Sequence, residues 1–201
     1  MNKWSRIKFT PNLPLGANGE RVTGSKAHIE LSKNAAKEGM VLLKNDSNVL
    51  PLAAGTRVAL FGKGTFDYVK GGGGSGDVTV AYIRNLYEGL KLQKDKISIF
   101  EELCDYYRKD IEEQYKNGNV PGMTIEPDVP NELLQKAKAY TDTAIITICR
   151  YSGEGWDRKS VRYEGQVSDE RRQSELSEKI FQDSDFCLTH EEAALVAKVK
   201  E

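Results

Sequence analysis

The residues from Thr143 to Cys149 constrain the fold more than any other stretch of the chain. This run is short, rich in β-branched side chains and uncharged, which is typical of a strand buried on both faces of a parallel sheet. Two more short apolar runs, at 57–61 and 97–100, have a similar character. Helical patterns separate the three runs, and strands that alternate with helices indicate parallel βαβ units. The sequence therefore predicts an α/β fold with a mostly parallel sheet flanked by helices.

The apolar periodicity also predicts where the helices lie. Helical patterns occupy five segments, at 25–46, 77–92, 101–115, 131–140 and from residue 189 onward. The last begins with a capping box, Thr189-His-Glu-Glu192, in which two side chains satisfy the first backbone N–H groups. The segment 160–185 is charged and poor in large apolar residues, so we expect it to add little to the core.

The composition excludes several classes of function. The 201 residues carry a net charge of −1 without any charged block, which argues against a nucleic-acid or acidic-membrane partner. No run approaches the roughly 20 apolar residues that a membrane-spanning helix needs. Three separated cysteines and two histidines form no disulfide framework or zinc pattern, and no cofactor is expected. With no signal-like apolar run after Met1, these features predict a soluble cytoplasmic protein.

A single carboxylate, Glu154, lies between two glycines shortly after the predicted strand 143–149. Ligands of open α/β sheets bind outside the carboxyl ends of the strands, and Glu154 would emerge there. Trp156 offers a flat apolar face, and Asp157 and Arg158 could pair to hold the loop. A solvated, charged surface loop is the alternative interpretation.

The second unusual segment is the glycine loop of residues 70–77, Lys-Gly-Gly-Gly-Gly-Ser-Gly-Asp. Its glycines satisfy the G-x-G-x-x-G spacing, and Glu101 lies near the position of a ribose-binding acid, so a dinucleotide site is one hypothesis. However, the preceding strand ends at Phe61, about ten residues too early for that fingerprint. A flexible surface loop is a second hypothesis. The third is a loop whose bare backbone, at Gly74, and hydroxyl, at Ser75, contact a ligand.

The two loops follow strands of the same predicted parallel sheet, so their ligand-facing ends would share one edge. A hydroxyl, a carboxyl, an aromatic face and bare backbone suit a polyhydroxylated, uncharged ligand such as a sugar. The sequence shows no cluster of basic residues near these loops that would bind phosphate groups.

Four segments together resemble one known family. They are Asn34-Ala-Ala-Lys-Glu-Gly-Met-Val-Leu-Leu-Lys-Asn45, Val49-Leu-Pro-Leu52, residues 71–78 and residues 152–158. In this order and spacing they resemble the α/β sandwich domain of glycoside hydrolase family 3, over about residues 25–201. The resemblance implies that Glu154 is the acid/base carboxyl and that Ser75 contacts the sugar. From the residues of the two loops, we expect Gly74 and Trp156 to bind the substrate as well.

The resemblance also implies an incomplete α/β sandwich domain. Residues 1–24 are expected to form an N-terminal arm or linker, and 25–201 the first part of the sandwich. In the family a barrel domain carries the nucleophilic aspartate, and nothing resembling that barrel is present here. The early start of the sandwich resembles the permuted branch of bacterial β-glucosidases, in which the barrel follows the sandwich.

The resemblance thus implies the N-terminal fragment of a retaining β-glucosidase that acts on β-glucosides or short oligosaccharides. Its partner would be the missing barrel of the same polypeptide, and the chain alone would be inactive. The alternative is a non-catalytic nucleotide- or sugar-binding α/β module.

Overall fold

The computed structural model describes residues 16–20, 22–71, 74–76, 78, 80, 82–150, 171–183 and 186–200. The chain divides into two compact units, Met1–Pro51 and Leu52–Glu201.

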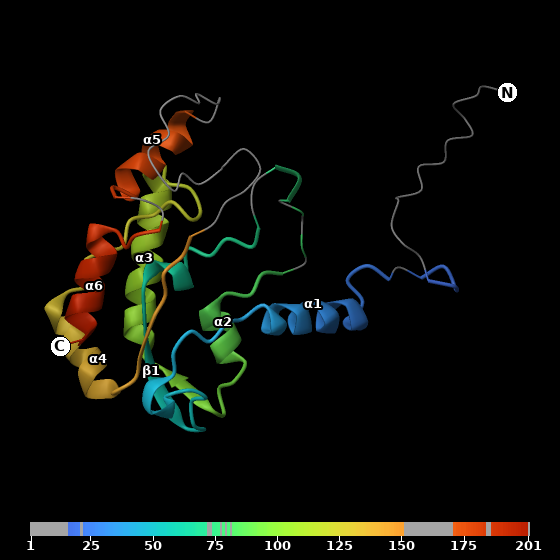
Figure 1. Ribbon diagram of the computed structural model, residues 1–201, viewed down its shortest axis with the longest axis horizontal. Helices are drawn as coiled ribbons and strands as arrows, with labels where there is room; N and C mark the ends of the chain where they lie inside the picture. Colours follow the sequence, from blue (N-terminus) through green and yellow to red (C-terminus); the bar gives the residue numbers. More distant parts are fainter. Residues whose placement is uncertain are drawn as a thin grey trace. The chain divides into compact units, whose positions relative to one another are not determined.

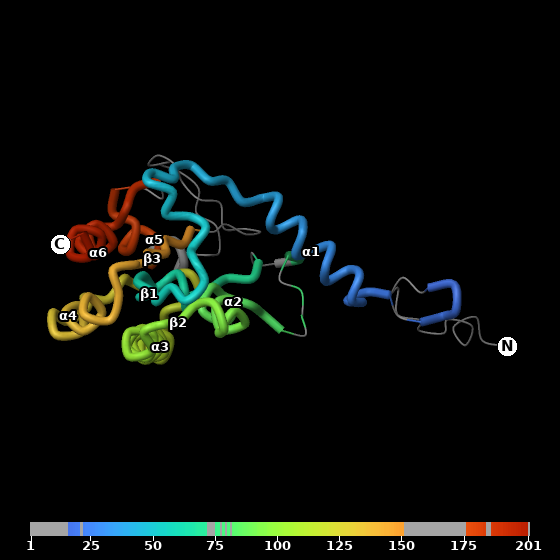
Figure 2. The backbone as a smooth tube through the Cα atoms, turned by 90° about the horizontal axis from the view of Figure 1, so that it is seen from below, coloured from blue at the N-terminus to red at the C-terminus, as the bar shows by residue number. Residues whose placement is uncertain are grey.

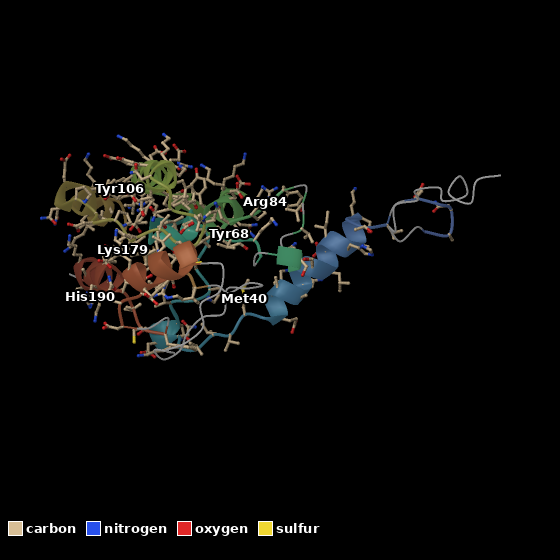
Figure 3. The ribbon with its side chains drawn as sticks, turned by 90° about the horizontal axis from the view of Figure 1, so that it is seen from above. Met40, Tyr68, Arg84, Tyr106, Lys179 and His190 are labelled. Carbon is tan, nitrogen blue, oxygen red and sulfur yellow. The ribbon has the colours of Figure 1, made fainter. Side chains whose placement is uncertain are left out.

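The first unit contains the helix α1 (Lys26–Glu38) and the 3-10 turn η2 (Asp46–Asn48). The Ser25 hydroxyl caps α1 by accepting a hydrogen bond from the His28 N–H at 3.4 Å. The predicted helix 25–46 is too long, because α1 ends at Glu38 and the next residue, Gly39, is a poor helix former. Residues 40–43 are non-helical and exposed, and Met40, labelled in Figure 3, is 74% exposed.

Over the described residues, the second unit is built on a three-stranded parallel sheet, as the sequence predicts. The prediction for 143–149 is wrong in its detail, because only residues 144–146 form a strand. These residues lie at an edge of the described sheet and are exposed or partly buried instead of buried on both faces. Its strands are β1 (Thr56–Phe61), β2 (Ile97–Ile99) and β3 (Ala144–Ile146), in the order β2-β1-β3. Both pairings with the central strand are parallel, and they are staggered along it. The first half of β1 pairs with β2, and its second half pairs with β3.

Five helices complete the second unit over the described residues. They are α2 (Leu86–Lys91), α3 (Glu101–Lys116), α4 (Asn131–Tyr140), α5 (Arg171–Ile180) and α6 (His190–Lys200). The long helix α3 runs beside β1 (Figure 1), and α4 and α6 are neighbours in that view and in the perpendicular view of Figure 2. The predicted capping box of α6 is confirmed, because the Thr189 hydroxyl accepts from the Glu192 N–H and the Glu192 carboxylate accepts from the Thr189 N–H.

The central strand β1 is buried on both faces. Its residues Ala59 and Phe61 pack in one cluster with apolar side chains of α3, α4 and α6. The alternate residues Val58 and Leu60 pack in a second cluster with Ile99, Cys104 and the partly buried α2. All four of these β1 side chains are at most 3% exposed. This double burial is the arrangement expected of a parallel strand within an α/β fold.

Two further local predictions are wrong. The predicted helix 77–92 is helical only over α2, because residues 78, 80 and 82–85 are not helical. Asn85 begins α2 with its own capping box to Glu88, whereas β-branched residues between Gly76 and Asn85 disfavour an earlier start. The charged segment 160–185 does contribute to the core, because Ile180 and Phe181 at the end of α5 bury against Met123.

Candidate functional site

The chain leaves β1 and β3 at the same edge of the sheet, and the two exits touch. Beyond β1 come Gly62 and the 3-10 turn η3 (Lys63–Thr65), and beyond β3 comes Thr147. The Thr147 N–H donates to the Phe61 carbonyl at 2.9 Å, and its hydroxyl donates to the Gly62 carbonyl at 2.9 Å. The hydroxyls of Thr65 and Thr147 are 3.1 Å apart. The segments that lead to the glycine loop and to the Glu154 loop therefore start side by side.

This close approach depends on two glycines. Gly62 has a φ of +92°, and a side-chain Cβ at this position would overlap the Thr147 backbone. A Cβ on Gly64 would lie 3.0 Å from the Cβ of Cys149. Glycine is thus required where β1 ends, both for its backbone conformation and for the space that Thr147 occupies.

The glycine loop is closed on itself. The Lys70 ammonium donates to the Val78 carbonyl at 2.6 Å, so the two ends of the loop lie together. Within it, Gly74 and Ser75 belong to the 3-10 turn η4 (Gly74–Gly76), and Ser75 is exposed. Among the described residues after this turn, no α-helix begins before α2 at Leu86. The phosphate site of a dinucleotide fold needs a helix N-terminus at its glycines, so the geometry does not favour that hypothesis.

The other predicted site residues, Glu154, Trp156, Asp157 and Arg158, lie outside the described residues. The described chain stops at Arg150 and resumes in α5. What the structure does give is the path of the chain up to Arg150, which lies four residues before Glu154.

Beneath the two exits lies a cluster of buried polar side chains that the sequence analysis missed. Asp67, which is 1% exposed, anchors the end of the η3 segment to the turn that follows α3. Its carboxylate accepts hydrogen bonds from the Tyr115 hydroxyl at 2.5 Å, the Gly122 N–H at 2.6 Å and the Thr124 hydroxyl at 2.6 Å. These contacts fix the chain that enters the glycine loop against residues more than 45 positions away.

Lys63 and Glu126 continue this cluster. The Lys63 ammonium donates to the Thr124 carbonyl, and its backbone N–H donates to the Glu126 carboxylate at 2.8 Å. The Tyr107 hydroxyl donates to the other oxygen of Glu126 at 2.8 Å. Burial lowers the pKa of the Lys63 ammonium, although the nearby carboxylates oppose this effect. Burial likewise raises the pKa of Glu126 to about 7, against the hydrogen bonds from Lys63 and Tyr107.

Arg150 forms an ion pair with Glu192, the capping residue of α6. Its two terminal nitrogens bind the two carboxylate oxygens at 2.8 and 2.6 Å, a bidentate pair in which Glu192 is 1% exposed. Arg150 also donates to the Cys187 carbonyl at 2.9 Å, and its guanidinium lies 4.6 Å from the centre of the Phe181 ring. Burial alone would raise the pKa of Glu192, but the hydrogen bonds from Arg150 and the Thr189 N–H outweigh it and lower that pKa.

Weak sequence signals for these residues exist in hindsight. Lys63 and Arg150 each stand a few residues beyond a strand, where ligand-site residues of α/β folds collect. Glu192 is visible as a capping residue, but the pattern does not show that it also binds an arginine 42 positions earlier.

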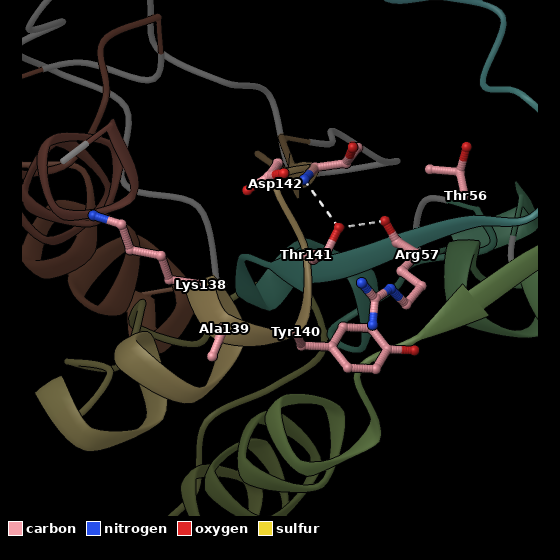
Figure 4. A pocket seen from close by; sticks show the side chains of 8 residues that line it. Thr56, Arg57, Lys138, Ala139, Tyr140, Thr141 and Asp142 are labelled. Atoms are coloured by element: carbon pink, nitrogen blue, oxygen red, sulfur yellow. Dashed lines mark hydrogen bonds between the residues drawn. The ribbon is translucent and has the colours of Figure 1, made fainter.

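A pocket of about 210 Å³ lies at the opposite edge of the sheet, where β1 and β3 begin. Figure 4 shows its lining, with the Arg57 guanidinium 5.3 Å from the centre of the Tyr140 ring and the Thr141 hydroxyl donating to the Arg57 carbonyl. Because α/β folds bind ligands at the carboxyl ends of their strands, this pocket is not the candidate site. Among the described residues, no three His, Cys, Asp or Glu side chains are grouped so that they could hold a metal ion.

Comparisons with known proteins agree on one family. The model of the glycosyl hydrolase family 3 C-terminal domain matches residues 40–199. Beta-glucosidase A of Butyrivibrio fibrisolvens is 59% identical over 202 residues, which cover 100% of this chain and 24% of that protein. A beta-glucosidase of Ruminococcus albus is 32% identical over 136 residues, covering 65% of this chain and 14% of its own length. The chain thus spans about a quarter or less of these curated relatives.

Solved structures show the same likeness. Beta-glucosidase 3B from Thermotoga neapolitana in complex with glucose superposes with a TM-score of 0.68 at 29% identity, over 86% of this chain and 22% of that one. A beta-glucosidase from Paenibacillus barengoltzii gives a TM-score of 0.59 at 32% identity, over 78% and 18% of the two chains. Within the described part of the chain, no helix has the length and apolar character needed to cross a membrane.

Proposed function

Because the chain belongs to the family of glycosyl hydrolase family 3 C-terminal domains, we propose that it supplies the acid/base side of a retaining β-glucosidase site. The enzyme would remove terminal β-D-glucosyl residues from β-glucosides or short oligosaccharides. The relatives from B. fibrisolvens and R. albus are named β-glucosidases, and both are several times longer than this chain. The rest of the polypeptide, with a barrel that carries the nucleophile, would complete the site.

The observation that carries this proposal is the contact between the two strand exits. Thr147 binds the Gly62 carbonyl, so the segments that lead to Ser75 and to Glu154 begin within hydrogen-bond distance of each other. A sugar held by the glycine loop would then lie within reach of a carboxyl carried on the neighbouring loop. We propose that Ser75 and Gly74 contact the sugar, that Trp156 covers it, and that Asp157 and Arg158 hold the loop.

The proposed chemistry uses two carboxyl groups about 5 Å apart, as retaining glycosidases do. The nucleophile from the barrel attacks the anomeric carbon while Glu154 gives its proton to the leaving oxygen. Glu154 then acts as a base and takes a proton from the water that releases the sugar from the nucleophile.

The test is Glu154→Ala in the complete polypeptide. General acid catalysis contributes about 10²- to 10⁴-fold, so turnover of cellobiose should fall by that factor. Formation of the glycosyl-enzyme should be spared with 2,4-dinitrophenyl β-glucoside, because so acidic a leaving group needs no proton. Azide should accelerate release of the enzyme-bound sugar and yield glucosyl azide, which product analysis would detect.

Glu164→Ala is the matched control. Glu164 also precedes a glycine and lies ten residues farther along the same segment, so it should leave these rates unchanged. Cellobiose turnover by Glu154→Ala at the parent rate, or an equal effect from Glu164→Ala, would contradict the assignment.

The domain organisation belongs to the same proposal. Residues 25–201 would be the first part of the sandwich domain, preceded by an arm or linker at 1–24, with the barrel following the sandwich. Sequencing the coding region after residue 201 tests this order.

A further inference from the structure

We propose that Arg150 is a positioning residue for the acid/base carboxyl, acting through its ion pair with Glu192. This inference rests on the proposed function, in which Glu154 is the acid/base group. Arg150 touches neither substrate nor reacting atoms in this proposal. Its role is to hold the point at which the chain leaves the sheet on its way to Glu154.

The first step of the argument is what Arg150 joins. It lies four residues beyond the end of β3, and its guanidinium binds the carboxylate of Glu192 and the carbonyl of Cys187. In the sequence, Cys187 and Glu192 come after the segment that carries Glu154. One side chain therefore ties together the chain before that segment and the chain after it.

The second step is how rigidly the hydrogen bonds hold Arg150 and Glu192 together. Both oxygens of Glu192 are used, and one of them also accepts from the Thr189 N–H at 2.9 Å, so the carboxylate is fixed by the start of α6. The Phe181 ring covers the guanidinium, and the ion pair is largely shielded from water. A planar guanidinium with two parallel hydrogen bonds fixes orientation as well as distance, which a lysine does not do.

The third step is what this firmness does for catalysis. A proton donor works only within a few tenths of an ångström of the productive geometry, and a misplacement of 1 Å can cost about 100-fold in rate. Glu154 is the fourth residue after Arg150, so movement at Arg150 displaces the origin of the segment that carries Glu154. Lys63 is a second cation nearby, but it belongs to the segment before the glycine loop and donates to the Thr124 carbonyl in the turn after α3, so it does not hold the chain that leads to Glu154.

The test measures leaving-group dependence in the complete polypeptide with Arg150→Lys and Arg150→Met. A misplaced proton donor slows only substrates that need the proton. We expect kcat for cellobiose to fall about 10-fold in Arg150→Lys and about 100-fold in Arg150→Met, with KM nearly unchanged. With 2,4-dinitrophenyl β-glucoside, the rate of glycosyl-enzyme formation should change less than about threefold.

Two further variants separate positioning from folding. Removing Arg150 alone leaves the buried Glu192 without its partner, so Arg150→Met could lose stability. The double variant Arg150→Met/Glu192→Leu removes both charges, and it should fold while retaining the slow turnover of cellobiose. Lys198→Met is the matched control, because Lys198 lies on α6 like Glu192 but pairs with Asp128 instead of with Arg150 or Cys187. It should match the parent in every rate.

The outcomes distinguish this inference from the proposed function. If Glu154→Ala shows leaving-group dependence and folded Arg150 variants do not, the function stands and the inference fails. If Glu154→Ala shows no leaving-group dependence, the proposed function fails, and amide hydrogen exchange then tests the role of Arg150 separately. Faster amide exchange at 147–158 and 186–190 in Arg150→Lys, but not in Lys198→Met, would support the inference that Arg150 holds these two segments together. Equal exchange rates in the two variants would overturn that inference.

Discussion

At the scale of single residues, the most unusual feature is the charge buried beneath the candidate site. Lys63, Asp67 and Glu126 are each at most 3% exposed. Lys63 and Asp67 bind backbone and hydroxyl groups of the turn after α3, and the Glu126 carboxylate, which belongs to that turn, accepts from the Lys63 N–H and the Tyr107 hydroxyl. Buried charges are costly unless such partners compensate them. The cluster is therefore a pH-dependent part of the fold as well as a support for the site.

The pH dependence can be predicted from Glu126. Its pKa is raised to about 7 by burial, so between pH 4.5 and 7 the folded chain holds a proton there that the unfolded chain releases. This stabilising contribution is full below the unfolded pKa and is lost as the pH rises through about 7. Relative to Glu126→Gln, the parent should lose about 3 kcal/mol of unfolding free energy over this range.

Urea unfolding of both proteins at pH 5, 6, 7 and 8 measures the difference. Glu112→Gln, an exposed change on α3, should track the parent at every pH. Parallel stability curves for the parent and Glu126→Gln would show that Glu126 titrates normally.

The sequence could not reveal this cluster. Lys63 and Glu126 are polar residues in segments between strands and helices, which is where exposed residues are normally found. Their burial follows from the turn at 118–126 folding back over the end of β1, a contact between positions about 60 residues apart. By contrast, Glu154 was singled out by its neighbours in the sequence, and its place in space stays a prediction.

At the scale of elements, the junction between β1 and β3 sets the geometry of the site. Gly62 allows the backbone of Thr147 to lie against the end of β1, and the two loops start from this contact. The residue after β1 must therefore be a glycine, because a side chain there would displace Thr147.

Substitution of Gly62 by alanine tests this requirement. Its positive φ costs an alanine about 1 kcal/mol, and the overlap with Thr147 adds the cost of moving a strand. We expect Gly62→Ala to lose about 3 kcal/mol in chemical unfolding. Gly55→Ala is the matched control, because Gly55 has a φ of +86° but no atom within 4 Å of its Cβ position. It should lose only about 1 kcal/mol, and equal losses would show that Thr147 is not the obstacle.

Element prediction succeeded where one face or both faces are buried and failed where the chain is open. The strand 57–61 and the helices 101–115 and 131–140 were confirmed, because burial imposes a clear period on their apolar residues. The helix 77–92 was wrong because its apolar spacing competes with β-branched residues and with the cap at Asn85. The hydrogen bonds of the capping box at Asn85, and not the hydrophobic pattern, determine where this helix begins.

At the scale of the whole molecule, the first unit presents apolar surface that its own described residues leave uncovered. Residues 40–43 of the first unit, Met-Val-Leu-Leu, are between 61% and 92% exposed. Contiguous apolar surface of this kind usually meets another part of a protein. The isolated chain should therefore bind a dye such as 8-anilinonaphthalene-1-sulfonate more strongly than the complete polypeptide does.

The isolated chain should also hydrolyse no aryl β-glucoside above background. General acid catalysis alone provides about 10²- to 10⁴-fold, far below the 10⁶-fold or more that is typical of enzymes. Release of p-nitrophenol from p-nitrophenyl β-glucoside measures this, with the complete polypeptide as the positive control. Robust turnover by the pure chain that is abolished by Glu154→Gln would show that the chain carries a complete site.

The staggered sheet has a consequence for the order of folding. β1 and β2 are joined by a connection of about 35 residues, whereas Ala59 pairs with Ala144 only after some 85 residues have been brought together. Long-range parallel pairing forms slowly, because the entropy of closing the loop is lost before the contacts are gained. On a ribosome, β1, α2, β2 and α3 can assemble while β3 is still being synthesised. The junction that carries both loops is then among the last parts of the domain to form.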